Sequence, residues 1–439
     1  MKYGLRVLTI VLALATTSIG VFAPSRAQAE PPSSCIVITG ATVWGPGPTG
    51  PTKLDGHGLR LRGPLIDEVS VAANDPATSP GCAVVDGRGQ LVTAGFIDPF
   101  TSLGLLEIDG ENTTVDTDNK ALHQDDQQLV RAAVKTSLGF NPRSALIPVA
   151  RVAGVTSALS WPVGGVIPGQ GFWVDLVGHA QARRKDSIRK DPAGLFVQLG
   201  ARGESRVSAL HVLDLALGEA AIWRRDRRAL ERVQRAPLLT PELDLAALDR
   251  ILTEKVPLVV RVERAADIEA LLETLDRLGA GKHPLVLVGA SESWLVADLL
   301  AEREVAVILD PLLYGPGGFD QLAARKDHAA VLNKAGVKLM VSPMDTHLIK
   351  KLRQLVGNAI REGLPWVEGL RAVTETPAEV FGMKGYGRLA AGSRANLVLW
   401  SGDPFELSSY AVKVFIDGKD LDLRTRQTEL FERWRTLPR

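Results

Sequence analysis

Asp345 and His347 are the pair of ionisable residues whose spacing best suits acid–base chemistry in this chain of 439 residues. A carboxylate two positions from an imidazole can act with it as a general acid and base. Both residues follow an apolar run at 337–341 that predicts a buried strand. The alternative, which the sequence leaves open, is that both are ordinary surface-loop residues.

The other histidines and the cysteines form no local metal-binding motif. The chain has seven His, and no two of them are closer than 19 residues. Two Cys are too few for a zinc module or a disulfide-dense scaffold. The stretch Gly279–His283 lacks the upstream glycine and the Ser or Thr of a phosphate loop. We therefore expect neither a sequence-local metal pair nor a phosphate-binding loop.

Strands and helices alternate between residues 93 and 387. Continuous apolar runs, typical of strands buried on both faces, are separated by amphipathic segments such as 268–278. Alternation over about 300 residues predicts an α/β barrel. The expected strands are 95–98, 154–160, 194–199, 256–262, 284–288, 305–310 and 337–341.

Loops that follow the strands form the active face of such a barrel. Arg261 and Glu263 end one predicted strand, and the Arg261 guanidinium could clamp a ligand carboxylate there. The equally open alternative is an internal salt bridge from Arg261 to Asp98 or Glu292.

Two glycine-rich loops also follow predicted strands. Tyr314 lies in one of them, which either covers a pocket or is a plain turn. Trp161 and Gln170 lie in the other, after the strand at 154–160, and we expect them to line a pocket wall.

β-rich segments flank the barrel region at residues 30–92 and 388–439. Each is too small to fold alone, so we expect the two to combine in one composite β domain beside the barrel. The predicted division is 1–29, 30–92, 93–387 and 388–439, with a terminal helix near 424–434.

The first 29 residues have the pattern of a secretory signal peptide. Lys2 and Arg6 precede an apolar run, and Ala27-Gln28-Ala29 supplies a cleavage site. We therefore expect a periplasmic or extracellular protein with no membrane span after cleavage. An oxidising compartment would allow Cys35 and Cys82 to pair, the alternative being two separate buried thiols.

Overall charge argues against nucleic acid as a partner. The chain carries 51 basic and 50 acidic residues, and removal of the leader's three basic residues leaves 48 against 50. Nucleic-acid-binding proteins usually show a basic excess or patch. A small-molecule ligand is the expected partner, and self-association stays open.

The order of local motifs resembles the amidohydrolase superfamily, particularly its imidazolonepropionase-like members. Val92–Asp98 resembles that family's entry into barrel strand 1, and Ala395–Trp400 with Gly402-Asp403-Pro404 resembles its closing β segment. Gly363-Leu364-Pro365 and Thr376-Pro377-Ala378 resemble the helices after its last barrel strand. The resemblance implies an α/β fold: a distorted (β/α)8 barrel of TIM type with a small composite β sandwich made by both chain ends.

The metal ligands that the resemblance implies are absent from this sequence. The family binds one or two divalent metals such as zinc, whereas Phe100 and Ser102 stand here at its paired strand-1 histidines. Arg261 replaces its strand-5 histidine, and no His lies near residues 289–292, where its strand-6 histidine is expected. The family's strand-8 Asp aligns with Met344 or, one residue later, Asp345. We therefore expect no bound metal or other cofactor.

Two functions remain open at the level of sequence. The resemblance implies an exported hydrolase of carbon–nitrogen bonds, with a reduced site in which Asp345, His347 and Glu292 are catalytic. The alternative is a catalytically silent relative that binds a small ligand or a protein. In either case the ligand-contacting residues are expected to be Arg261, Glu263, Trp161, Gln170, Tyr314, Phe100 and Ser102.

Overall fold

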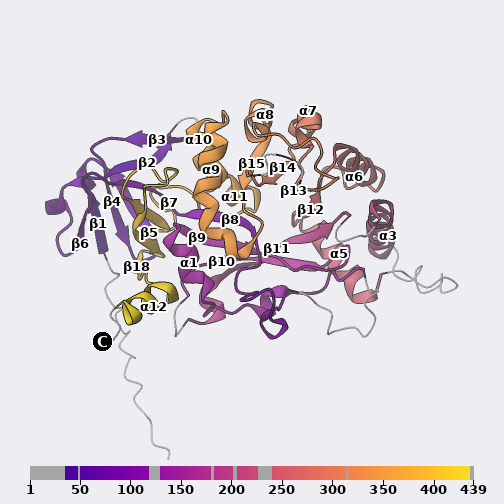
Figure 1. Cartoon of the computed structure of the whole chain (residues 1–439), viewed down its shortest axis with the longest axis horizontal. Coiled ribbons are helices and arrows are strands. Elements are labelled where there is room, and N and C mark those ends of the chain that lie inside the picture. Colours follow the sequence, from indigo (N-terminus) through magenta and orange to yellow (C-terminus); the bar gives the residue numbers. More distant parts are fainter. Residues whose placement is uncertain are drawn as a thin grey trace, which may run out of the picture. The chain divides into compact units, whose positions relative to one another are not determined.

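The barrel consists of one eight-stranded sheet in the described part of the chain (Figure 1). The computed structural model describes residues 35–47, 50–117, 129–178, 182–200, 205–225, 240–312, 315 and 317–435. The strands, in sheet order, are β8 (Phe96–Thr101), β9 (Val155–Ser160), β10 (Gly169–Asp175), β11 (Ile188–Gln198), β12 (Leu258–Val262), β13 (Leu285–Gly289), β14 (Ala306–Leu309) and β15 (Lys338–Val341).

Strand β10 is an element that the sequence did not predict. It runs antiparallel to both β9 and β11, whereas the other neighbours in the sheet are parallel. Gln170 was expected in a loop but lies in this strand. Its glycines give the reason: a Cβ at Gly171 would lie 2.1 Å from the Trp161 ring. These glycines therefore mark close packing inside a strand and not a turn.

Side chains, and no backbone ladder, close the barrel between its end strands β8 and β15. Ser342 Oγ lies 2.7 Å from Asp98 Oδ1 and 2.8 Å from the carbonyl of Phe100. Thr346 Oγ1 accepts from the Ser102 N–H at 2.9 Å. The eight-stranded sheet thus supports the predicted distorted barrel of TIM type, with an irregular seam.

The helices of the barrel region pack their apolar faces on the sheet. In α6, for example, Ile268, Leu271, Leu272 and Leu275 are buried on one face, as their spacing requires. The helices are α1 (Leu146–Val152), α2 (Arg184–Ser187), α3 (Arg206–Arg225), α5 (Glu242–Thr253), α6 (Ala265–Arg277), α7 (Ala297–Glu302), α8 (His328–Lys334), α9 (Leu352–Arg361), α10 (Trp366–Ala372) and α11 (Glu375–Val380). None of the helices in the described residues is long and apolar enough to cross a membrane.

Both chain ends contribute to one six-stranded sheet beside the barrel. The C-terminal strand β16 pairs with β7, and β7 pairs with the N-terminal strand β2 (indigo and yellow in Figure 1). The strands in order are β18 (Lys419–Leu421), β17 (Ala411–Ile416), β16 (Leu397–Trp400), β7 (Leu91–Ala94), β2 (Thr42–Gly47) and β3 (Gly50–Leu54). Helix α12 (Arg426–Trp434) follows.

A second, four-stranded sheet completes the β sandwich. Its order is β5 (Leu65–Ser70), β4 (Gly58–Arg62), β1 (Cys35–Thr39) and β6 (Ala83–Asp86). Residues of both sheets, including Ile38, Leu61, Leu397 and Phe415, share one buried cluster. The sandwich core therefore depends on segments more than 300 residues apart, as expected for two ends that cannot fold alone.

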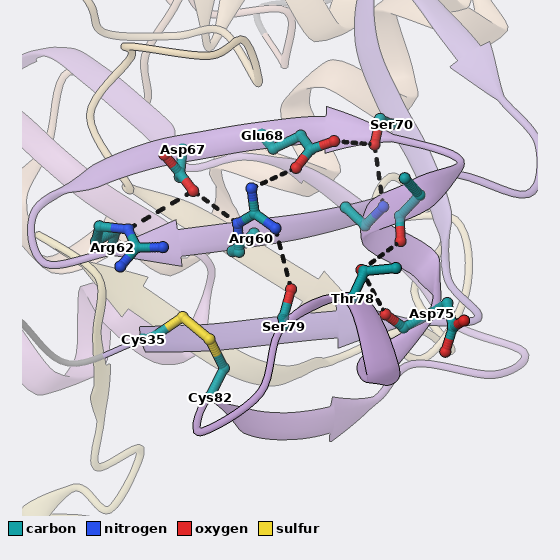
Figure 2. Close-up of polar contacts among 12 residues, drawn as sticks. Cys35, Arg60, Arg62, Asp67, Glu68, Ser70, Asp75, Thr78, Ser79 and Cys82 are labelled. Carbon is teal, nitrogen blue, oxygen red and sulfur yellow. Dashed lines mark hydrogen bonds and ion pairs between the residues drawn. A yellow bond between two sulfur atoms is a disulfide. The ribbon is translucent and has the colours of Figure 1, made fainter.

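Cys35 and Cys82 form a disulfide across this four-stranded sheet (Figure 2). Their Cα atoms are 4.6 Å apart, within the usual range for a disulfide. Next to it, Arg60 on β4 pairs with Asp67 on β5 at 2.6 Å and donates to Ser79 at 3.1 Å. The loop that carries Cys82 is thus attached to β1 by a covalent bond and to the β4–β5 hairpin by Arg60.

Arg189 connects the barrel to the composite sheet. Its guanidinium pairs with the fully buried Asp175 on β10 at 2.8 Å and with Asp417 in the turn between β17 and β18. Tyr386 also donates to Asp175, at 2.9 Å. Buried charges need such partners, so this network fixes the two parts against each other.

Candidate functional site

An aromatic cluster of Phe100, Trp161, Phe196 and Phe381 fills the inside of the barrel. Phe100 lies with its ring centroid 5.1 Å from that of Phe196 and 6.1 Å from that of Trp161. The Trp161 ring is 6.0 Å from Phe381 and is 1% exposed. Phe100, at 7% exposure, and Trp161 are therefore core residues, although both were expected to contact a ligand.

Glycines and a hydrogen bond hold Trp161 in this position. A Cβ at Gly194 would lie 2.8 Å from the indole, in addition to the clash described at Gly171. The indole N–H donates to the carbonyl of Pro99 at 2.9 Å. Ser102 Oγ donates to the Trp161 carbonyl at 3.0 Å, so this hydroxyl also serves the packing of the cluster.

Gln170 likewise has a structural role. Its side-chain amide donates to the carbonyl of Ala132 at 2.8 Å, and the residue is 1% exposed. The expectation that Gln170 lies in a loop was wrong, because the residue belongs to strand β10; its expected contact with a ligand stays a prediction. Tyr314, which was expected to cover the pocket, lies outside the described residues.

The side chains of Asp345 and His347 do not form a hydrogen bond with each other. The Asp345 carboxylate accepts the backbone N–H of His347 at 2.8 Å and that of Leu348 at 3.3 Å, so it caps the 3-10 helix at Thr346–Lys351. The His347 ring instead lies near Asp109, at 3.9 Å. The structure thus does not bring the two side chains together as an acid–base pair.

Replacing Asp345 tests this capping role. We expect Asp345→Ala to lower the free energy of unfolding by about 1 kcal/mol and Asp345→Asn to retain most of it, because Asn also caps helices. His347→Ala is the control and should stay within about 0.5 kcal/mol, since its ion pair is partly exposed. Urea unfolding measures all three, and an unchanged Asp345→Ala would contradict the capping role.

Glu292 also serves a helix end. Its carboxylate accepts the N–H of Ala265, the first residue of α6, at 3.1 Å. The structure therefore gives Glu292 a local backbone partner and does not pair it with Asp345 or His347.

Polar side chains gather one layer beyond the aromatic cluster, towards the carboxyl ends of the strands. Val259 and Phe196 point into the barrel, and alternate residues of a strand share a face, so Arg261 and Gln198 also point inward. The two are direct partners across β12 and β11. Gln198 was missed in the sequence, although its place at the end of a predicted strand was a usable signal.

The Arg261 side chain makes no ion pair or hydrogen bond within the described residues. The salt bridges to Asp98 or Glu292 that the sequence left open are not formed. The half-buried guanidinium does act on Glu263, where it lowers the pKa of the carboxyl, but burial outweighs this effect and raises that pKa. Arg261 is therefore a cation at the barrel mouth without a protein partner in the described chain.

Glu263 lies over the end of the neighbouring strand β13. One carboxylate oxygen accepts both the N–H and the hydroxyl of Ser291, the N–H at 3.2 Å. The other oxygen lies where a Cβ at Gly289 would be 2.3 Å away, so this position requires glycine. Ala290 and Met344, at the ends of β13 and β15, have φ of 47° and 52°, so strained backbone marks the same edge.

Asp310 adds a further carboxylate at this edge. One oxygen accepts the N–H of Leu312 at 2.8 Å, and burial raises the pKa of the group. A small cavity beside it, of about 10 Å³, is lined by residues such as Ser291, Arg325 and His328. It has room for about one water molecule.

Among the described residues, no three His, Cys, Asp or Glu side chains lie where they could hold a metal ion together. His328, for example, lies against Ser293 Oγ at 2.8 Å, and burial lowers its pKa to about 4.

Comparison with known proteins defines the class of this barrel. The amidohydrolase family model matches residues 340–420. An amidohydrolase from Thermotoga maritima MSB8 superposes with a TM-score of 0.75 at 24% identity, covering 89% of this chain and all of that one. An adenosine deaminase from Xanthomonas campestris with bound zinc superposes with a TM-score of 0.54 at 17% identity, covering 89% and 93%.

The fold is therefore that of the amidohydrolases, and the resemblance predicted from the sequence is confirmed. In sequence the chain is similar to the amidohydrolase tasK of Hapsidospora irregularis, with 22% identity over 373 residues. The match covers 76% of this chain but spans only 37% of the length of that relative.

Proposed function

We propose that this protein uses an amidohydrolase barrel to bind a small molecule without metal-dependent hydrolysis. The observation that carries the proposal is the aromatic cluster, in which Phe100 and Trp161 occupy the inside of the barrel where β8 and β9 end. A ligand can then reach only the layer beyond the cluster, where Gln198, Arg261 and Glu263 lie.

The residues at the positions of the implied metal ligands do not fit a divalent cation. A phenyl ring offers no lone pair, the Ser102 hydroxyl is engaged with a carbonyl, and the Arg261 cation would repel a metal ion. Asp345 is an exposed helix cap. We therefore assign no catalytic step to a metal in this protein.

Export is part of the proposal. The leader-like residues 1–29 lie outside the described residues, so the pattern in the sequence carries this point. The Cys35–Cys82 disulfide supports it, because structural disulfides persist mainly in oxidising compartments.

Hydrolysis of a carbon–nitrogen bond is the competing function, since the similar proteins are amidohydrolases. The test combines metal analysis with turnover. Protein purified from zinc-supplemented medium should hold well below one metal ion per chain and should not turn over a panel of N-acyl amino acids and other amides. The zinc-binding deaminase from Xanthomonas campestris, prepared in parallel, is the control for metal retention. Stoichiometric metal, or turnover above the background rate, would overturn the proposal.

A further inference from the structure

The Gln198 side chain makes no hydrogen bond within the described residues, although the residue is only 8% exposed. Its backbone N–H is used, by the carbonyl of Val166 at 2.8 Å. The amide atoms are not among the fully buried side-chain atoms that lack a partner, so they remain accessible at the barrel mouth. An accessible amide without a protein partner at this place is a contact that a ligand can use.

Arg261 stands next to this amide with its own donors free. The two residues are register partners on parallel strands, so their side chains leave the sheet side by side on its inner face. An Arg guanidinium offers five N–H donors, and a Gln amide adds two more. Together they match the oxygens of a carboxylate, which Arg binds in a bidentate manner.

Glu263 supplies the opposite charge two residues after Arg261, just beyond the end of β12. Only one of its carboxylate oxygens is engaged, by Ser291, and the other has no hydrogen bond within the described residues. Residues two apart on an extended chain are separated by about 6.6 Å, and no ion pair links Glu263 to Arg261. The barrel mouth thus presents one cation and one anion that form no ion pair with each other in the described residues.

We propose that Gln198, Arg261 and Glu263 form a subsite for a free α-amino acid. The ligand carboxylate binds Arg261 and the Gln198 amide, and its ammonium group binds the free oxygen of Glu263. The inference rests on the proposed function, because it names the ligand class of the same barrel mouth.

The charges of Arg261 and Glu263 favour a free α-amino acid over other classes of ligand. The adjacent Glu263 carboxylate would repel a phosphate or dicarboxylate, while Arg261 would repel a simple amine. Burial raises the pKa of Glu263, so an unpaired carboxylate there gains from a cationic partner. A zwitterion satisfies both residues and brings no net charge into the mouth.

Isothermal titration of the full chain with each common L-amino acid tests the subsite. For any amino acid that binds, the N-acetyl derivative and the methyl ester should bind at least about tenfold more weakly, because each loses one charge-assisted contact. Arg261→Ala should weaken binding by about 10- to 100-fold, and Gln198→Ala by a few-fold to about tenfold. Glu263→Gln should abolish the preference for the free amino acid over its N-acetyl form.

Matched variants separate binding from folding. Arg426→Ala removes an exposed guanidinium on α12 and should leave affinity unchanged, and Arg261→Lys keeps the charge but loses the bidentate geometry, so its affinity should lie between wild type and Arg261→Ala. Unchanged thermal unfolding shows that each variant is folded.

The subsite is refuted if no amino acid binds, if the blocked forms bind as well as the free amino acid, or if Arg261→Ala has no effect on binding. Tight binding of a blocked form to a metal-free, inactive protein would refute the subsite and leave the proposed function standing, whereas stoichiometric metal with turnover would refute the proposed function.

Discussion

Raising the pH from about 4 to about 8 should destabilise the wild-type protein relative to Asp98→Asn by on the order of 4 kcal/mol. Asp98 is fully buried in β8, and burial raises its pKa from 3.8 to about 7 despite hydrogen bonds that lower it. The folded state therefore holds a proton that the unfolded state has released across this interval. Stability from this group is complete below about pH 4 and is lost as the pH rises through about 7.

Hydrogen-bond geometry at the barrel seam gives an independent reason for a protonated Asp98. Ser342 Oγ accepts the N–H of Met344 at 3.0 Å and lies within 2.8 Å of two oxygens, Asp98 Oδ1 and the Phe100 carbonyl. A hydroxyl has a single proton, so it can donate to only one of these two. If Asp98 is a carboxylic acid, it donates to Ser342, which then donates to Phe100. No charged side chain in the described chain contributes to this pKa shift.

Urea unfolding at several pH values measures the effect as the difference between wild type and Asp98→Asn. Taking this difference removes the pH dependence of the free energy of unfolding that comes from the other carboxyl groups, because both proteins contain them. Asp67→Asn is the control of opposite sign: Arg60 lowers the pKa of Asp67, so its contribution is lost as the pH falls and is constant between about pH 4 and 8. A flat difference for Asp98→Asn across this interval would show that Asp98 is ionised at the seam.

Much of the fold could be predicted from the sequence, because buried strands and amphipathic helices leave local patterns of apolar residues in it. Buried strands such as β13 and β14 are continuous apolar runs, and helix α6 shows a clear apolar stripe. Strand β10 was missed because Gly169 and Gly171 normally indicate a turn. Gly171 makes room for the Trp161 ring and Gly169 for the backbone at Val134, and these contacts become visible only when the chain is assembled.

The candidate site was less accessible, since the sequence does not show what a polar side chain contacts. Asp345 and His347 have suitable types and spacing, but the Asp345 carboxylate is used by backbone N–H groups. Gln198 gives no signal in the sequence, because a single Gln does not form a recognisable motif. Its significance comes from an amide without a protein partner at the barrel mouth and from its register with Arg261, both of which are three-dimensional properties.

The aromatic cluster is held together by mutual packing of residues from several strands. The resemblance in the sequence predicts a histidine at the position of Phe100, whose ring needs apolar neighbours, and Trp161 and Phe196 supply them. Gly171 and Gly194 then provide the space for the indole. The polar residues that remain available for binding lie beyond this layer, which is why the proposed ligand contacts are Arg261 and its neighbours.

Truncation of a side chain in the aromatic cluster should therefore lower the free energy of unfolding. We expect Phe100→Ala to lower the free energy of unfolding by about 3–5 kcal/mol, as for other buried Phe residues, because it leaves a cavity among packed aromatic rings. Phe319→Ala is the matched control: that side chain is 93% exposed, and its loss should change stability by no more than about 0.5 kcal/mol. Urea unfolding of both variants gives the comparison.

Phe100→His extends the same experiment to the metal question. We expect it to be destabilising too, since the imidazole would be buried without a hydrogen-bond partner among aromatic rings. Added zinc should not restore the lost stability, because Ser102 and Arg261 provide no second ligand. If Phe100→His were as stable as wild type and gained stability with zinc, the barrel would hold a usable metal site and the proposal of a barrel without metal-dependent hydrolysis would be contradicted.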